Sequence, residues 1–143
     1  MKKGWMRLAF HKDSLVPPIY PSTDMPGIKL HIGSGEINIQ GWINLDARAF
    51  PHTHIVSDKI DLSAFADYSI SSVYLCHLLE HFSFGEVSQI LQLIHKKLKP
   101  NGKILISVPD LSKLVDVFRE FGDDVELIST ALMGGQDYNF NFH

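Results

Sequence analysis

The chain has 143 residues, of which 45% are hydrophobic and 20% are charged, and this composition is typical of a single globular domain. A formal charge of −3 at pH 7 excludes a general basic field, so we expect no binding of duplex nucleic acid through phosphate contacts alone. No stretch approaches the roughly 18 apolar residues of a membrane-spanning helix, and the only cysteine, Cys76, excludes an internal disulfide, so we expect a cytoplasmic protein that does not enter membranes.

The amino-terminal part of the chain predicts an arm rather than part of the core. Residues 11–27 contain four prolines and one glycine and show no apolar period, which is typical of a loop draped over a surface. We therefore divide the chain into an arm at residues 1–27 and a folded domain at residues 28–143.

Five apolar runs predict the strands of a sheet. Strands of parallel sheets read as short continuous apolar runs, often rich in β-branched residues. Such runs lie at residues 28–33, 41–47, 54–58, 72–76 and 102–109. The third run is the weakest of the five, and the last is the clearest.

A predicted helix joins the fourth and fifth runs. Ser83 and Glu86 form the pattern of a capping box, and apolar residues then recur with helical period until Pro100. Further helices are predicted at residues 111–121 and near 123–133. This alternation of strands and helices predicts a parallel α/β sheet whose ligands bind at the carboxyl ends of the strands.

A glycine turn and an acid follow the first two runs. Gly33 and Gly35 allow a sharp turn close to a ligand, with exposed amide groups for a carboxylate or phosphate. Asp46 ends the second run, where it can accept two hydrogen bonds from a ribose diol or act as a turn acid. A dinucleotide site would need a third glycine where Asn38 stands and a later acid. Too few residues separate the two runs for a crossover helix, so a turn or extended segment is expected.

Four motifs in this order resemble a known family: the glycine turn, "GWINLD", "HLLEH" and "LKPNGKILISVPD". The chain is similar to class I S-adenosylmethionine-dependent methyltransferases, in the bacterial branch with a short G-W-I-N connection. The resemblance covers residues 28 to about 143. It implies a Rossmann-like sheet of order 3-2-1-4-5 that lacks the usual closing antiparallel strand pair. It also implies methyl transfer from S-adenosylmethionine to an oxygen or nitrogen of an acceptor that the sequence does not identify.

The resemblance implies which residues hold one half of the cofactor. Gly33, Ser34 and Gly35 would lie against its methionine end, and Asp46 would hold the ribose hydroxyls. The family often has an acid two residues before the first glycine, where it meets the amino group of the cofactor, whereas this chain has His31.

The other implied positions follow the third and fourth runs. Asp61 and Leu62 would face the adenine through a side-chain acceptor and a backbone amide. His77 would line the pocket near the reacting sulfonium. Every one of these residues stands in a loop after a predicted strand, which agrees with the order of runs along the chain.

His81 is the candidate catalytic residue. A histidine titrates near neutral pH and can take a proton from an acceptor hydroxyl or amine. The alternative is a structural histidine that donates a hydrogen bond to a backbone carbonyl. Methyl transfer from a sulfonium is an in-line displacement in which positioning can dominate, so a base is optional for the implied reaction.

The segment "HLLEH" at residues 77–81 also fits the H-x-x-E-H pattern of inverzincin metallopeptidases. Such a zinc site requires a helix, which brings residues four apart onto one face, and a further ligand from elsewhere. The segment instead lies between a strand and the capped helix, with room for little more than one turn. We therefore expect no metal, and a zinc hydrolase stays as a rival function. Another rival is a binding module that holds the cofactor without catalysis or only with a partner chain.

The last predicted strand raises the question of what covers its edge. Without a closing strand pair, residues 103–108 would expose the sequence "KILISV" at the edge of the sheet. We predict that the aromatic tail with Tyr138, Phe140 and Phe142, or a second subunit in a homodimer, covers this edge.

Overall fold

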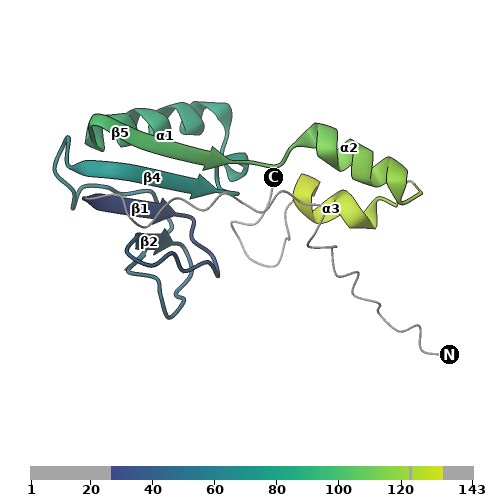
Figure 1. Cartoon of the computed structure of the whole chain (residues 1–143), viewed down its shortest axis with the longest axis horizontal. Helices are drawn as coiled ribbons and strands as arrows, with labels where there is room; N and C mark the ends of the chain where they lie inside the picture. The colour runs from purple at the N-terminus through teal and green to yellow at the C-terminus, as the bar shows by residue number, and fades with distance from the viewer. Residues whose placement is uncertain (1–26, 123, 134–143) are drawn as a thin grey trace.

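The strands of this protein form one parallel sheet (Figure 1). The structure is a computed structural model that describes residues 27–122 and 124–133. Five strands lie in the order β3-β2-β1-β4-β5, and every neighbouring pair is parallel. The predicted Rossmann-like α/β sheet of order 3-2-1-4-5 is confirmed. Most of the predicted arm and the aromatic tail lie outside the described residues.

The strands lie at the five predicted places. Their bounds are Ile28–Ile32 for β1, Ile43–Asp46 for β2, Ile55–Val56 for β3, Ile70–Cys76 for β4 and Leu98–Ser107 for β5. The run predicted as the weakest gives the shortest strand, β3. β5 begins before the predicted residue 102, because Leu98 already pairs with Ile70 ahead of a register shift that sets Lys103 opposite Ser72.

The connection from β1 to β2 consists of turns, as its short length predicts. Gly35 and Gly41 have φ values of 52° and 79°, in the left-handed region that glycine enters without strain. Ile39 and Trp42 are buried and pack against Tyr74 of β4, with the Trp42 and Tyr74 ring centroids 6.5 Å apart. These contacts hold the connection against the sheet face in place of a helix.

The other face of the sheet is covered by α1, which spans Phe84–Lys97 (Figure 1). Both hydrogen bonds of the predicted Ser83 and Glu86 capping box are present. Ile90 and Ile94 are buried and pack on side chains of the central strands. Strand β4 is buried along almost its whole length, including the two serines Ser71 and Ser72 that precede its apolar part.

Helices α2 (Leu111–Glu120) and α3 (Glu126–Met133) confirm the last two predicted helices. They lie beyond the carboxyl end of β5 and contact each other (Figure 1). Apolar side chains at the two ends of α2 stay largely uncovered, because Leu111 and the following residue Phe121 are 63% and 52% exposed. The helix turns away from the sheet after β5, so these two side chains do not reach the core.

β5 is the last strand of the described sheet, and its edge carries apolar side chains. Ile104 and Ile106 are 38% and 46% exposed. Ile104 pairs with Val73 of β4, and Ile106 pairs with Leu75. The two isoleucines therefore extend the apolar face of the sheet against which α1 packs at β4. The prediction that the tail or a second subunit covers this edge stays a prediction.

Candidate functional site

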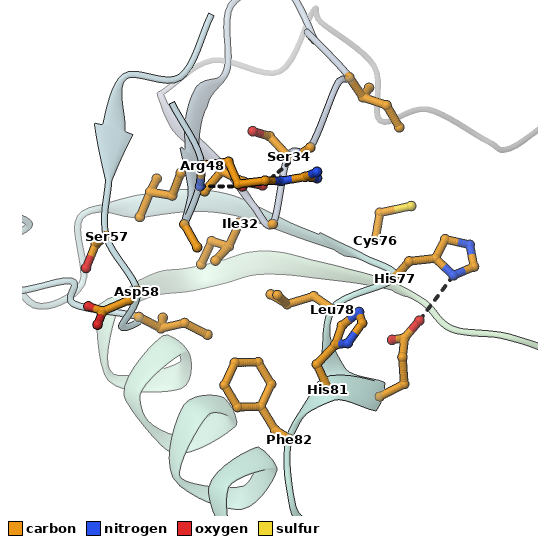
Figure 2. A pocket seen from close by; sticks show the side chains of 18 of the residues that line it. Ile32, Ser34, Arg48, Ser57, Asp58, Cys76, His77, Leu78, His81 and Phe82 are labelled. Carbon is orange, nitrogen blue, oxygen red and sulfur yellow. Dashed lines mark hydrogen bonds and ion pairs between the residues drawn. The ribbon is translucent and has the colours of Figure 1, made fainter. Parts of the chain in front are cut away.

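A cavity of about 680 Å³ opens at the carboxyl ends of β1, β2, β3 and β4 (Figure 2). Its wall consists of the segments that follow these four strands, with one residue each from α1 and α3. The lining residues are 32–37, 45–48, 57–60, 76–78 and 80–82, together with Glu86 and Thr130. The volume suits a small-molecule ligand, and this end of a parallel sheet is where ligands bind in open α/β folds.

The cavity brings together most of the site residues predicted from the sequence. The predicted residues in its wall are Gly33, Ser34, Gly35, Asp46, His77 and His81. Asp61 and Leu62 lie outside the wall, which ends at Ile60 on that side. The carboxylate of Asp61 accepts a hydrogen bond from the Ser63 amide, which lowers the pKa of Asp61, and Leu62 is fully buried in the core.

The glycine turn after β1 lies against the end of β2. The amides of Gly33 and Ser34 both donate to the Leu45 carbonyl, at 2.9 and 3.1 Å. The amide of Gly35 donates to Oδ2 of Asp46 at 2.7 Å. The expectation that these amides are free for a ligand is therefore wrong, because the register of β1 and β2 sets an acceptor beside each of them.

The absence of a side chain at Gly33 is what opens the wall at this point. Its φ is 73°, and a Cβ atom here would lie 2.8 Å from Cδ1 of Leu78. Real Cβ atoms do not approach other carbon atoms so closely. Gly33 therefore lets the turn after β1 pack against the segment after β4, and a ligand in the cavity meets backbone rather than a side chain.

Asp46 connects two loops of the site. Its Oδ2 accepts from the Gly35 amide and its Oδ1 accepts from the Arg48 amide at 2.9 Å. A carboxylate has about four acceptor positions, so the two amides leave acceptor capacity for donors of a ligand. The side chain is only 9% exposed, which places this capacity inside the cavity rather than in bulk water.

Arg48 is a wall residue that the sequence analysis missed. Its guanidinium lies 4.7 Å from the ring centroid of Phe50, a cation–π distance, and its Nε is 3.7 Å from Oδ1 of Asp46. Figure 2 shows Arg48 alongside Ser34 at one side of the cavity. The signal in the sequence is its place two residues after the acid that ends β2.

His77 occupies an unusual backbone position at the end of β4. Its φ is 49°, in the left-handed region that residues other than glycine seldom adopt, although asparagine, aspartate and histidine enter it more often than the rest. Its amide donates to the Ser107 carbonyl of β5 at 2.9 Å. The ring contacts a carboxylate, with Nδ1 3.1 Å from Oε1 of Glu80 (Figure 2). This hydrogen bond raises the pKa of His77 above its ordinary value of 6.5.

His81 lies beside Leu78 and Phe82 in the same wall (Figure 2). It is half-buried, and its amide donates to the Leu78 carbonyl at 3.2 Å. The structure thus places His81 where it can contact a ligand, and its role as a proton acceptor stays a prediction.

The "HLLEH" segment forms a single 3-10 turn, Leu79–His81, rather than an α-helix. His77 precedes this turn in a left-handed conformation, so it does not share a helix face with His81. Among residues 27–122 and 124–133, no three histidine, cysteine, aspartate or glutamate side chains are placed to hold a metal ion. The carboxylate that the zinc pattern would use contacts the imidazole of His77 instead.

His31, two residues before the first glycine of the turn, lies in β1 outside the cavity wall. It is fully buried, and its ring stacks on Tyr74 with centroids 4.9 Å apart. Neither ring nitrogen has a hydrogen-bond partner among the described residues. Burial lowers the pKa of His31 to about 4, although the negative charge of Asp46 offsets part of this effect.

The lowered pKa predicts that His31 makes the fold sensitive to acid. The unfolded chain takes up this proton near pH 6.5 and the folded chain only near pH 4, so unfolding binds a proton between these values. Stability is therefore lost as the pH falls from 6.5 towards 4, by about 2 kcal/mol at pH 5. Replacing His31 with phenylalanine keeps a ring against Tyr74 and should remove this loss, as measured by urea unfolding at pH 7.5 and 5.0.

The control for this prediction is His95→Gln on the exposed side of α1. An exposed side chain stays hydrated in both states, so this variant should keep the acid sensitivity of the parent chain. If His31→Phe and the parent chain lost the same free energy of unfolding between pH 7.5 and pH 5.0, His31 would not be the source of the acid sensitivity.

None of the helices within residues 27–122 and 124–133 is long and apolar enough to cross a lipid bilayer.

Comparison with known families gives one match. Residues 39–106 match the family model described as a methyltransferase domain. The matched part runs from the β1–β2 connection into β5, and it contains Asp46, His77, Glu80 and His81. No significant match was found among curated proteins or among solved structures.

Proposed function

We propose that the chain binds S-adenosylmethionine in the cavity and methylates an oxygen or nitrogen of an acceptor, on the premise that its residues 39–106 match the family model of a methyltransferase domain. The observation that carries the proposal is the convergence of the glycine turn and Asp46 on one cavity. Members of this family generally use this methyl donor, whose sulfonium supplies an activated methyl group.

The polar and small residues of the cavity suit such a ligand. Gly33 provides a wall without a side chain, against which the methionine end would lie. The hydroxyl oxygen of Ser34 is buried without a hydrogen-bond partner among the described residues, so it can serve a polar group of the ligand. The remaining acceptor positions of Asp46 would take the two ribose hydroxyls.

The adenine end is assigned to the segment after β3. This segment forms the wall from Ser57 to Ile60, and the predicted residues Asp61 and Leu62 follow directly. Because Leu62 is buried in the core, its backbone is held firmly beside the wall. In this arrangement the sulfonium would lie towards the end of β4, near His77.

The chain contributes to the reaction mainly by positioning. An in-line displacement requires the attacking atom opposite the leaving sulfur, and holding both partners removes most of the entropic part of the barrier. The mouth of the cavity next to His77 and His81 is where an acceptor would enter, because these side chains belong to the segment that follows β4.

Isothermal titration calorimetry with S-adenosylmethionine, together with metal analysis by mass spectrometry, tests this proposal. We expect saturable binding at one ligand per chain and competition by S-adenosylhomocysteine. The absence of any binding heat, combined with stoichiometric zinc, would favour the zinc hydrolase instead. Binding without turnover of any acceptor would favour a cofactor-binding module that needs a partner chain.

A further inference from the structure

The proposed function places His77 near the sulfonium but gives no chemical role to the contact between His77 and Glu80. His77 holds the left-handed backbone described above, at the point where β4 ends. Backbone strain of this kind costs about 1 to 3 kcal/mol and persists where the surrounding structure enforces it, often at functional sites. Here the hydrogen bond from its amide to Ser107 and the contact of its ring with Glu80 fix the conformation.

The contact with Glu80 decides which ring nitrogen of His77 faces a substrate. Glu80 is ionised at neutral pH, because the hydrogen bond from His77 and nearby positive charge outweigh the burial that alone would raise its pKa. An ionised carboxylate accepts hydrogen bonds and donates none. Nδ1 of His77 therefore carries the proton, and Nε2 of a neutral His77 has a free lone pair.

The two side chains differ in exposure in a way that suits proton transfer. The side chain of Glu80 is 12% exposed, and that of His77 is 61% exposed at the mouth of the cavity. The second oxygen of Glu80, Oε2, is buried and has no hydrogen-bond partner among the described residues. The carboxylate contacts the imidazole of His77 through Oε1, and its negative charge would stabilise the ring once the ring is protonated.

We propose that His77 is the proton acceptor of the methyl-transfer step, that Glu80 is its positioning residue, and that the substrate attacks through a hydroxyl oxygen. This inference rests on the proposed function. A bond forms between the substrate oxygen and the methyl carbon, the carbon–sulfur bond breaks with its electron pair left on sulfur, and the hydroxyl proton goes to Nε2 of His77. One positive charge is lost at sulfur and one is gained on the imidazole, so the net charge in the cavity does not change.

A hydroxyl acceptor explains why a carboxylate-backed histidine stands at the mouth of the cavity. A neutral amine attacks through a lone pair that it already has, whereas a neutral hydroxyl is a weak nucleophile unless a base takes its proton during attack. A base works best when its pKa is near the working pH, and Glu80 moves the pKa of His77 upward from 6.5. The other titratable side chains of the wall near this segment are Cys76, His81 and Glu86, and His81 is the rival base.

The first test needs no acceptor. Nitrogen-15 NMR of the histidine rings in the full chain, across a pH titration, should show His77 protonated on Nδ1 and titrating above pH 6.5. Glu80→Gln should lower the pKa of His77 and weaken the preference for Nδ1. The matched control Glu120→Gln, on the exposed side of α2, should change neither property. A His77 that titrates at or below 6.5, or that does not respond to Glu80→Gln, would overturn the pairing.

The second test uses two probes of the same shape, phenol and thiophenol, with formation of S-adenosylhomocysteine as the readout. Thiophenol is largely ionised at pH 7.5 and needs no base, whereas phenol needs one. His77→Asn keeps the left-handed backbone at low cost, and it should slow methylation of phenol by about 100-fold or more while changing the rate with thiophenol only a few-fold. Glu80→Gln should act in the same direction but less strongly.

The outcomes separate this inference from the proposed function. Failure of the parent chain to bind S-adenosylmethionine would reject the proposed function. The NMR titration would still test whether His77 is paired with Glu80. Binding with equal slowing of both probes by His77→Asn, or loss of phenol methylation in His81→Asn alone, would reject His77 as the base. Binding with methylation of thiophenol but not of phenol by the parent chain would reject the hydroxyl class of acceptor.

Discussion

Replacing Gly33 with alanine should abolish measurable binding of S-adenosylmethionine and lower the free energy of unfolding by at least about 2 kcal/mol. The backbone φ of 73° is unfavourable for any residue with a Cβ atom, and the added methyl group would lie 2.8 Å from Cδ1 of Leu78. Relief of this overlap requires the turn after β1 or the segment after β4 to move, and both form the cavity wall. Calorimetry and urea unfolding measure the two effects.

Gly85→Ala provides the matched control. Gly85 lies in the first turn of α1, and an added Cβ atom there would meet no atom within 4 Å among the described residues. Alanine in place of glycine in a helix stabilises by about 0.5 to 1 kcal/mol, so this variant should be at least as stable as the parent chain and bind the cofactor equally. Unchanged affinity in Gly33→Ala would show that the ligand does not approach this turn.

The features that the sequence predicts well are those with a local cause. The positions of the strands along the chain follow from short apolar runs, whereas the order 3-2-1-4-5 came from the family resemblance. The start of α1 follows from a side chain that accepts a hydrogen bond from a backbone amide three residues away. Both were confirmed, as were the short connection before β2 and the limit of little more than one turn in "HLLEH". Each depends on contacts between residues that are close along the chain, so a pattern within a few residues is enough to reveal it.

The features that the sequence did not predict depend on register between distant segments. The amides of Gly33 and Ser34 donate hydrogen bonds to the Leu45 carbonyl because β1 and β2 pair in one particular register. No pattern within a few residues of the sequence reveals that register. The contact of His77 with Glu80 likewise requires a left-handed residue before a 3-10 turn. The spacing of the two residues is readable in the sequence, but the backbone that turns them towards each other is not.

The proposed position of the adenine shows the same limit. The order of the motifs put Asp61 and Leu62 in the loop after β3, and both residues do follow β3. The cavity wall, however, is made by the four residues from Ser57 to Ile60. The path of that loop depends on the burial of Leu62, which draws the chain into the core just after the wall. A search for ligand contacts should therefore begin with Asp58 and Ile60 as well as with the two predicted residues.

Asp46 is the residue at which the fold and the proposed chemistry meet, and its replacement should affect both. In Asp46→Asn, an amide nitrogen replaces one oxygen and would face the N–H of either Gly35 or Arg48. A buried donor left without an acceptor costs about 1 to 3 kcal/mol, so we expect a loss of stability of this size. The charge that would hold the ribose hydroxyls is lost as well. Hydrogen bonds to a charged group contribute about 1.5 to 3 kcal/mol each, so affinity for S-adenosylmethionine should fall by about 100-fold or more.

A comparison of three variants separates the two roles of Asp46. Asp116→Asn, on the exposed surface of α2, should change stability by less than about 0.5 kcal/mol and leave affinity unchanged. Asp46→Ala leaves both amides without their acceptor, so it should lose more stability than Asp46→Asn. If the Asp46 carboxylate only stabilised the turn, the apparent affinity for S-adenosylmethionine would fall only in proportion to the fraction of chain that is unfolded. Loss of affinity under conditions where Asp46→Asn is still fully folded, seen by calorimetry and circular dichroism on the same sample, would show direct contact with the ligand. Full affinity in a folded Asp46→Asn would reject the ribose assignment, because the charged acceptor that it depends on would be gone.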